Sequence, residues 1–387
     1  MFKQLMEQPT AAEAVKRPKR DWAFTTEYLP HDPNSAVVTA VTTAQLDGDK
    51  AIQQFIIAQG GVIPKGYRAR LVEMRHQTAG WTRDNKEDAA ITKPVFFYRF
   101  AIEPITNVRN IEELLKHIQK KPAPRSTNDS PTVFTFAAGD LQLGKCDGDG
   151  TKGIIDTYNA SVQAAVKLWR KAGKPRVQIA FAGDCIEGNV SQNGRNMWRT
   201  ELTVTEQVRV FRRLILHTID AFIEAPTVEI DVVNGNHDQV QRFQETRADD
   251  GHATEAAIAV ADAMQLNHDR YGHCRVYVPT KDSDHITRTV GATVMTIAHG
   301  HQWRRGQAMQ WLAGQALNMQ PAAETQILLH GHEHEFGVRS RATRLILCTP
   351  ALESESTWWK HKTGDQGKRG CIAFLHTAGT LEGLHLV

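Results

Sequence analysis

Beyond residue 131 the chain alternates short apolar runs with amphipathic stretches, and this alternation constrains its fold more than any other feature. Residues 132–138 and 177–182 have the composition of buried strands. Between them, apolar side chains recur every three or four residues and mark one face of a helix: Ile154, Tyr158, Val162, Ala165 and Trp169. A strand, a helix and a second strand in this order predict a βαβ unit with parallel strands. The chain is therefore expected to be an α/β protein.

A second helix is predicted to begin after Thr203, because Thr203 and Glu206 have the spacing of a capping box. Its apolar stripe again recurs every three or four residues, from Val204 to Phe222. Further strands are predicted at 228–233, 292–297 and 326–329, further helices at 254–264 and 310–319, and a β-rich end at 345–349, 370–376 and 381–387.

The residues before this region differ in composition, and a length of 387 residues suits about two domains. Residues 1–34 are polar and carry a basic cluster, which indicates a flexible basic arm. Residues 35–120 are expected to form a small α+β module, with helices at 49–58 and 111–118 and strands at 67–72 and 95–102. The segment 121–131 carries three prolines among polar residues and is the predicted linker to a main domain at 132–387.

The composition excludes several classes of protein. No stretch approaches the roughly 20 apolar residues that cross a bilayer, and the N-terminus lacks the apolar segment of a signal peptide. We therefore expect a cytoplasmic protein without a membrane anchor. The five cysteines are scattered and never form a C-x-x-C pair, which argues against a disulfide framework and a thiolate zinc site. A net charge of +3 permits a nucleic-acid partner but does not require one.

Polar clusters follow five of the predicted strands at the point where each strand ends. They are Gly139-Asp140-Leu-Gln142, Gly183-Asp184-Cys-Ile-Glu187, Gly235-Asn236-His237-Asp238, His299-Gly300-His301 and His330-Gly331-His332-Glu-His334. Ligands of open α/β sheets bind outside the carboxyl ends of the strands, so these clusters are expected to converge. Glycine in every cluster allows tight turns and close backbone approach.

The convergent side chains are carboxylates, amides and imidazoles, which are ligands for Mn²⁺, Fe²⁺, Zn²⁺ or Mg²⁺. Clustered carboxylates would repel one another without cations. The ligands are too many for one tetrahedral ion, whereas two ions about 3.5–4 Å apart with a bridging carboxylate would use them. The sequence therefore predicts a dinuclear centre.

With these motifs in this order, residues 139–334 resemble the calcineurin-like metallophosphoesterase superfamily. Its signature is D-x-H, G-D-x-x-D/E, G-N-H-D/E, H and G-H-x-H, and each cluster here follows a predicted strand. The resemblance implies an αββα sandwich, preceded here by the small α+β module. It also implies that two metal ions activate a water for in-line attack on phosphorus, with no covalent enzyme intermediate.

The resemblance assigns metal-binding roles to seven residues: Asp140, Gln142, Asp184, Asn236, His299, His332 and His334. Asp140 and His334 would hold the first ion, and Asp184 would bridge. Asn236, His299 and His332 would hold the second. The family usually has a histidine at the position of Gln142, so the neutral amide should favour a harder ion, unless Gln142 does not ligate at all. Mn²⁺ is thus the expected metal, with Mg²⁺, Fe²⁺ or Zn²⁺ as alternatives.

Two catalytic roles follow from the same resemblance. His237 would protonate the leaving oxygen or contact the scissile phosphate, and Glu187 would orient His237. His301 is expected to contact a phosphate. Arg209, with Arg212 and Arg213 on the same face of the second helix, either belongs to a solvated face or steers a polyanion into the site.

The substrate expected from the sequence is a nucleic acid. The string Asp140-Leu-Gln-Leu-Gly144 resembles that of the nuclease subunit of the double-strand-break repair complex, and the single-chain form resembles phosphoesterases encoded by bacteriophages. In the module, arginines interleave with aromatic residues, a pattern that suits single strands but equally an ordinary amphipathic sheet: Arg68, Arg70, Arg75, Arg83 and Arg99 with Tyr67, Trp81, Phe97 and Tyr98. The sequence also leaves open that the module binds a protein partner. The alternatives are a small-nucleotide phosphoesterase or phosphatase, and a metal-free interaction scaffold of the same fold.

Overall fold

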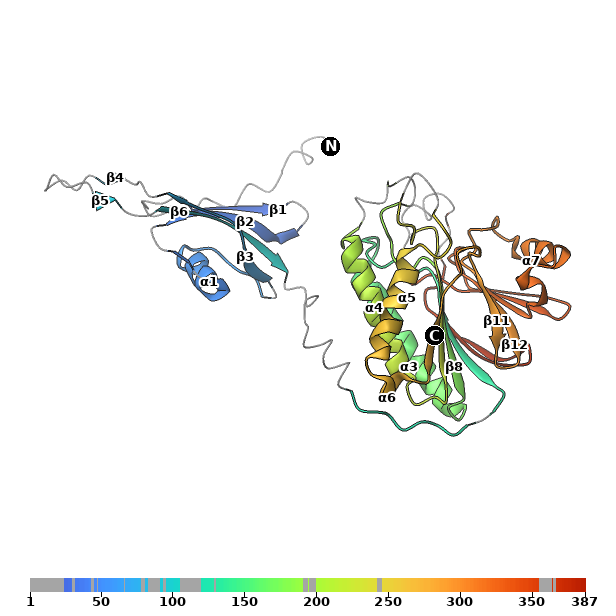
Figure 1. Ribbon diagram of the computed structural model, residues 1–387. Coiled ribbons are helices and arrows are strands. Elements are labelled where there is room, and N and C mark those ends of the chain that lie inside the picture. Colours follow the sequence, from blue (N-terminus) through green and yellow to red (C-terminus); the bar gives the residue numbers. More distant parts are fainter. Residues whose placement is uncertain are drawn as a thin grey trace. The chain divides into compact units, whose positions relative to one another are not determined.

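The computed structural model describes residues 24–29, 32–42, 45–46, 48–65, 67–77, 81–82, 91–92, 95–104, 120–128, 130–190, 194, 200–241, 246–354, 364 and 367–387. The chain divides into two compact units, Met1–Arg109 and Asn110–Val387 (Figure 1). The expected helix at 111–118, and Arg83 of the module, lie outside the described residues. Among the described helices, none is both long and apolar enough to span a membrane.

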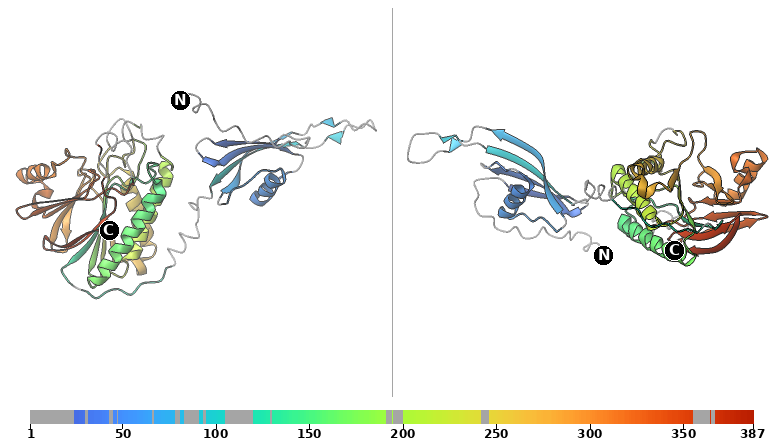
Figure 2. Two further views of the ribbon diagram at one scale, coloured as in Figure 1. Left: turned by 180° about the vertical axis from the view of Figure 1, so that it is seen from behind. Right: turned by 60° about the horizontal axis from the view of Figure 1, so that its bottom comes forward.

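The first unit contains an antiparallel sheet in the order β1 (Phe24–Leu29), β2 (Asp32–Thr42), β6 (Val95–Pro104) and β3 (Tyr67–Gln77). Helix α1 (Gly48–Ala58) covers one face of this sheet (Figure 2). Its Ile52 and Ile56 pack with Tyr98 and Phe100 of β6 in a small core. A short pair of strands, β4 (Trp81–Thr82) and β5 (Ile91–Thr92), extends the hairpin between β3 and β6.

The prediction of an arm over residues 1–34 is wrong at its C-terminal end. Residues 24–29 form β1, which pairs antiparallel with β2, and β2 already begins at Asp32. Phe24 and the threonines after it have high β propensity. Pairing with β2 also gives the backbone N–H and C=O groups of β1 their hydrogen-bond partners. In the sequence, Pro30 and Pro33 interrupt the apolar pattern, which hides this pairing.

The second unit contains a six-stranded sheet whose outer face is covered by helices. The strand order is β10 (Cys274–Tyr277), β9 (Val228–Val233), β8 (Arg176–Ala182), β7 (Val133–Ala138), β16 (Ile372–Thr377) and β17 (Thr380–Leu386). Strands β7 to β10 are parallel, as the βαβ pattern predicts. Helices α3 (Gly150–Lys171), α4 (Val204–Ala221) and α5 (His252–Gln265) share one core with this face, and the short α6 (His268–Tyr271) follows them.

A second, five-stranded sheet packs against the inner face of the first. Its order is β11 (Ile286–Val290), β12 (Thr293–Ile297), β13 (Ile327–His330), β15 (Arg344–Cys348) and β14 (Gly337–Arg341). Val133 and Ala180 of the first sheet share a core with Met295, Ile297 and Leu329 of the second. Helix α7 (Ala308–Leu317) covers the outer face of the second sheet, and the 3₁₀ helix η4 (Pro321–Glu324) follows it (Figure 1). The four layers form an αββα sandwich, which confirms the predicted fold class.

Two local predictions illustrate why these segments fold as they do. Strand β7 is buried at every position because helices cover one of its faces and the second sheet covers the other, so its residues are apolar on both faces except for Thr135, which hydrogen-bonds Gln178. Helix α4 begins with the predicted capping box. Thr203 Oγ1 accepts from the Glu206 backbone N–H at 3.3 Å, and Glu206 Oε2 accepts from the Thr203 N–H at 2.9 Å.

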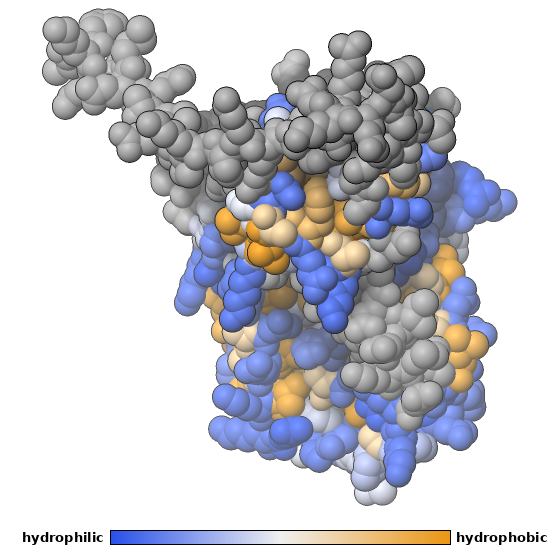
Figure 3. Space-filling model, turned by 90° about the vertical axis from the view of Figure 1, so that its left-hand side faces the viewer, coloured by the Kyte–Doolittle hydropathy of each residue, from blue (hydrophilic) through white to orange (hydrophobic). Residues whose placement is uncertain are grey.

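The predicted linker runs along the surface of the second unit. The Ser126 N–H donates to the Glu224 carbonyl at 2.7 Å, and the Asn128 amide donates to the Gly173 carbonyl at 2.8 Å. On the face of the molecule drawn in Figure 3, hydrophobic groups lie among hydrophilic side chains.

Candidate metal centre

The candidate ligands lie at the carboxyl ends of strands from both sheets. Asp140, Asp184 and Asn236 follow β7, β8 and β9 of the first sheet, whereas His299 and His332 follow β12 and β13 of the second. In each sheet these strands are parallel to one another, so their carboxyl ends lie at one edge. The structure therefore brings together clusters that are far apart in the sequence, as predicted.

Backbone conformation holds these side chains in unusual positions. Asp140, Gln142, Asp184, His332 and His334 all have positive φ angles, between 44° and 69°. Such angles are costly for residues with a Cβ atom and persist where the surrounding structure enforces them, which is typical of functional sites. The strain is invisible in the sequence.

Glycine makes one close approach possible. A Cβ atom on Gly235 would lie 2.0 Å from Asp184 Oδ1, so only glycine lets the turn after β9 pass against the Asp184 carboxylate. The next residue, Asn236, thereby reaches the same point as Asp184. The glycine of this cluster thus has the role that the sequence predicts.

Four of the candidate ligands surround one point. His299 Nε2 lies 3.3 Å from Asp184 Oδ2, 3.2 Å from Asn236 Oδ1 and 3.2 Å from His332 Nδ1. Two atoms bound about 2.1 Å from one ion lie about 3.0 Å apart at an octahedral edge and about 3.4 Å apart at a tetrahedral edge. The observed separations match such an edge, so these residues fit a divalent transition metal.

Asp140 and His334 form a second pair beside the first group. Asp140 Oδ1 lies 3.4 Å from His334 Nε2, and this buried oxygen has no hydrogen-bond partner among the described residues. Its other oxygen accepts from the His332 backbone N–H at 2.8 Å. A buried carboxylate oxygen without a partner is costly, and a cation between it and the imidazole would satisfy it.

The tautomers of two histidines are fixed by acceptors on the side away from this point. His299 Nδ1 donates to the Ala182 carbonyl at 2.8 Å, and His334 Nδ1 donates to Glu353 Oε1 at 2.9 Å. Their Nε2 atoms are therefore directed at the Asp184 and Asp140 carboxylates. This is the arrangement of metal-binding imidazoles, whose other nitrogen donates to a carbonyl or carboxylate.

The carboxylates make this edge strongly attractive to positive charge. Burial alone would lower the pKa of His299, but the Asp184 carboxylate outweighs burial and raises the pKa to about 9. Burial lowers the pKa of His332 to about 3, with the neighbouring His299 acting in the same direction. The second imidazole is thus held neutral beside the first, as metal ligation requires.

His237 also lies beside the Asp184 carboxylate, but farther from it than His299 does. Its Nδ1 donates to the Glu187 carbonyl at 3.0 Å and lies 3.4 Å from Glu187 Oε2, while its Nε2 lies 3.8 Å from Asp184 Oδ2. Burial opposes protonation, but Asp184 and then Glu187 raise the pKa of His237 to about 10. The two residues assigned to catalysis therefore contact each other next to the centre.

Gln142 makes a contact that the sequence does not predict. Its Oε1 atom, the expected ligand atom, accepts from Lys145 Nζ at 3.0 Å. Lys145 also forms a buried ion pair with Glu353, the residue that accepts from His334. No feature of the sequence motifs points to Lys145 or Glu353.

Asp238 and Gln207 are two further residues without an assigned role in the sequence analysis. The Asp238 carboxylate accepts backbone N–H groups from both the Asp184 loop and the Asn236 loop. Gln207 accepts from the Gly188 N–H at 2.8 Å and donates to the Leu202 carbonyl. Asp238 is part of the G-N-H-D string, which is a signal for it, whereas Gln207 has none.

The predicted substrate residues have different positions. His301 is exposed, and its ring centroid lies 5.4 Å from that of His299. It lines a polar hollow of about 480 Å³ together with Gly235, Arg247 and Lys281, so this hollow adjoins the metal centre. Arg209 is half-buried on α4, and the described residues show no hydrogen bond or ion pair between it and the centre.

No family model and no curated protein sequence matches the chain. Among solved structures, an archaeal phosphodiesterase is similar with 11% identity over 66% of this chain and 99% of the other, at a TM-score of 0.31. A Vps29 protein from Entamoeba histolytica complexed with Zn²⁺ has 10% identity over 66% and 98%, at 0.31. The phosphoesterase Yfce from E. coli has 10% identity over 65% and 98%, at 0.29. Phosphoesterases are thus among the similar structures.

Proposed function

We propose that the protein is a metal-dependent hydrolase of phosphoesters, and that the cluster around His299 is its metal centre. The observation that carries this proposal is the set of 3.2–3.3 Å separations that join His299 Nε2 to Asp184, Asn236 and His332. When bound, divalent cations would supply a nucleophilic water and stabilise charge on the phosphoryl oxygens. Mn²⁺ suits the mixed nitrogen and oxygen ligands.

The residues of the chain supply the proton chemistry. His237 holds its proton at Nδ1 toward Glu187, which leaves Nε2 on the side of Asp184. In the protonated form, which the two carboxylates stabilise, Nε2 donates a proton to the leaving oxygen. Glu187 fixes the plane of the ring and thereby the direction of that donation.

Within this class we favour phosphodiesters of nucleic acids, so that the protein would act as a nuclease. The hollow beside the centre has the size of a ligand site, and it is lined by polar and charged side chains. Its basic residues Arg247 and Lys281 and the neighbouring His301 would contact phosphates that flank the scissile one. The aspartates of the hollow would repel a long polyanion, so we expect the hollow to hold only a short segment of the substrate.

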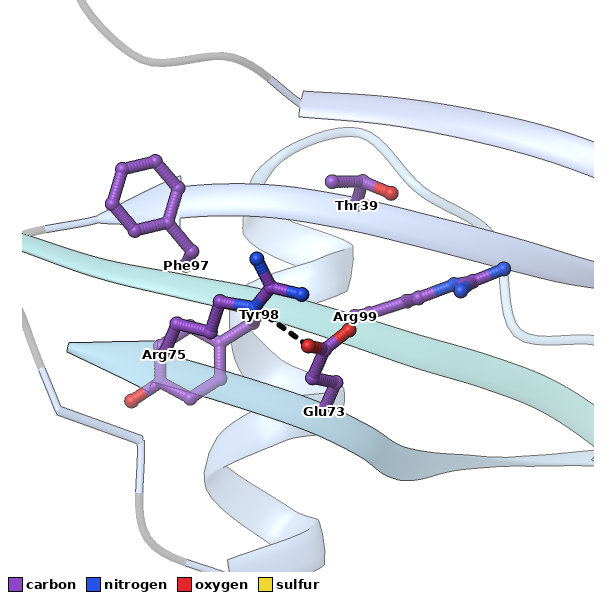
Figure 4. A pocket seen from close by; sticks show the side chains of 6 residues that line it. All are labelled: Thr39, Glu73, Arg75, Phe97, Tyr98 and Arg99. Atoms are coloured by element: carbon purple, nitrogen blue, oxygen red, sulfur yellow. Dashed lines mark hydrogen bonds and ion pairs between the residues drawn. The ribbon is translucent and has the colours of Figure 1, made fainter.

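The open face of the module sheet supports the same preference. Phe97 and Tyr98 leave β6 on opposite sides: Tyr98 is in the core, whereas Phe97 is 37% exposed on the face away from α1 (Figure 4). Arg75 lies opposite Phe97 on β3, and Arg99 is two residues along β6. These side chains line a hollow of about 270 Å³ with Thr39 and Glu73. Exposed aromatic and guanidinium groups on one face can stack on bases and pair with phosphates.

Hydrolysis assays test the proposal at two levels. Purified protein with added Mn²⁺ is expected to hydrolyse bis(p-nitrophenyl) phosphate, and Asp184→Ala is expected to abolish this turnover. Asp262→Asn, a change at an exposed position of α5, is the matched control. Absence of turnover in the wild type would refute the hydrolase and favour an interaction scaffold. Single- and double-stranded DNA and RNA are compared next with cyclic nucleotides and p-nitrophenyl phosphate, and cleavage of the small substrates alone would refute the nuclease.

Binding by the module is measured separately. The double change Arg75→Glu and Arg99→Glu is expected to weaken binding of a single-stranded oligonucleotide at least tenfold, because it reverses two charges next to Phe97. The double change Lys50→Glu and Lys65→Glu, at exposed positions outside the sheet, alters the net charge equally and is the control. Equal affinity of the wild type and the double variant in fluorescence anisotropy would remove this face from the proposal.

A further inference from the structure

We propose that the two metal positions are unequal, because Lys145 binds the Gln142 amide oxygen that would be the third ligand beside Asp140 and His334. The inference rests on the metal binding of the proposed function, but not on the substrate. The position formed by Asp184, Asn236, His299 and His332 is then the tight site. The position formed by Asp140 and His334 binds a divalent cation second and more weakly.

The first observation is the place of Lys145. This lysine is only 9% exposed, and its ammonium group donates to Gln142 Oε1 at 3.0 Å and pairs with Glu353. The Gln142 amide oxygen, which could have been a ligand of the weak position formed by Asp140 and His334, therefore accepts a hydrogen bond from the Lys145 ammonium group instead. The contacts with Gln142 and Glu353 hold the buried ammonium group firmly, since each contact offsets part of the free energy that its burial costs.

The second observation is that Glu353 connects this lysine to a ligand. Glu353 is 8% exposed; one of its oxygens pairs with Lys145, and the other accepts from His334 Nδ1 at 2.9 Å. His334 is thereby fixed with Nε2 toward Asp140. Because Lys145 neutralises Glu353, this carboxylate adds little negative charge to the weak position, although it orients the His334 imidazole.

The third observation is the number of ligand atoms at each position. Asp184, His299 and His332 offer atoms that all lie within 4.8 Å of one another, and in the described part of the chain no other three His, Cys, Asp or Glu residues do so. Asn236 adds a fourth ligand there. The other position has Asp140 and His334 of its own and can only share Asp184. Fewer ligands and a nearby ammonium group both reduce its affinity.

Titration of the metal-free full-length protein with Mn²⁺ tests this inference without any substrate. Isothermal calorimetry is expected to resolve two steps, with the second dissociation constant at least roughly tenfold above the first. Electron paramagnetic resonance is expected to show an isolated Mn²⁺ signal at one equivalent and a loss of intensity through spin coupling at excess metal. Two ions that bind the wild type with equal affinity would overturn the inference. No binding at all would instead refute the proposed function.

Variants then identify which position fills first. Asp140→Asn is expected to remove the second step and leave the first, whereas Asn236→Ala is expected to weaken the first step. Lys145→Gln frees Gln142 and Glu353, so the second dissociation constant is expected to fall at least several-fold. The inference is overturned if Asp140→Asn removes the tight step, or if a folded Lys145→Gln protein shows an unchanged second step. Should Lys145→Gln fail to fold, Gln142→His provides the same test, because an added imidazole is expected to strengthen the weak position.

Discussion

Asp238 is expected to hold the two loops of the metal centre together, and its removal is the most informative test of how the centre is built. The side chain is fully buried. Its Oδ1 accepts from the N–H groups of Cys185 and Ile186, each at 3.1 Å, and its Oδ2 accepts from Gly235 at 2.8 Å. One carboxylate thus ties the loop of Asp184 to the loop of Asn236.

The cost of removing this carboxylate follows from the three donors. Asp238→Ala leaves three buried N–H groups without a partner, and each costs about 1–3 kcal/mol. The change also removes a carboxylate whose charge is unfavourable in this place, since burial and the nearby Asp184 raise the pKa of Asp238 to about 7. We therefore expect a net loss of about 3 kcal/mol in the free energy of unfolding. Asp238→Asn keeps an acceptor for two donors but places its amide N–H₂ against one, so a loss of about 1–2 kcal/mol is expected.

Urea unfolding of the full-length protein measures these losses, and Mn²⁺ titration of the same variants measures the effect on the centre. The expected order of stability is wild type, Asp238→Asn, Asp238→Ala, with the metal affinity falling in the same order. Asp262→Asn removes a carboxylate from an exposed position of α5 and is expected to change the free energy of unfolding by less than about 0.5 kcal/mol. An Asp238→Ala protein as stable as this control, with unchanged metal affinity, would refute the reasoning.

Three further predictions concern the second unit. His376 is buried between Thr293 and Thr135, and burial lowers its pKa to about 4. The unfolded state therefore binds the proton first as the pH falls below about 6.5, so stability measured by urea unfolding should drop by about 2 kcal/mol from pH 8 to pH 5 through this group, and His376→Gln should remove that part of the slope. Arg288→Met leaves the fully buried Asp231, now paired at 2.6 and 2.7 Å, without its cation; thermal unfolding should report a loss of about 3–5 kcal/mol, and a loss below 1 kcal/mol would contradict the pairing. Tyr158→Phe removes a buried 2.6 Å hydrogen bond to Thr218 and should cost about 1 kcal/mol in urea unfolding, whereas an unchanged midpoint would count against this bond.

The fold is predictable from the sequence where elements are buried on a regular period. Helices α3 and α4 and strands β7 to β9 follow from such periods, because each of them contributes large side chains to the core. The sequence pattern does not predict β1, β10, β11 and β14, and all four are edge strands of their sheets. An edge strand buries less surface and is partly exposed, as in β14, so its composition differs little from that of a loop.

Strand β2 is also absent from the prediction, although it lies inside the sheet of the module. Its buried positions are occupied by Ala36, Val38 and Ala40. Small side chains at the inner positions give a weak alternating signal, because alanine has low β propensity and contributes little apolar area.

The convergence of the candidate ligands is predictable because each motif follows a strand, and the topology of parallel strands does the rest. What each ligand atom contacts is not predictable in the same way. Glu353 approaches His334 from a loop after β15 that carries no recognisable motif, so only the packing of the second sheet brings the two together.

The same reasoning explains why the sequence cannot decide the role of Gln142. An amide at this position can ligate a metal or accept from a donor, and its chemical nature permits both. The choice depends on the loop after β7, where Gln142 adopts a φ angle of 44° and the Gln142 carbonyl accepts from the Lys145 N–H at 3.1 Å. This turn brings the Lys145 ammonium group back onto the Gln142 side chain. Loop geometry, rather than residue type, therefore assigns the amide oxygen to the lysine.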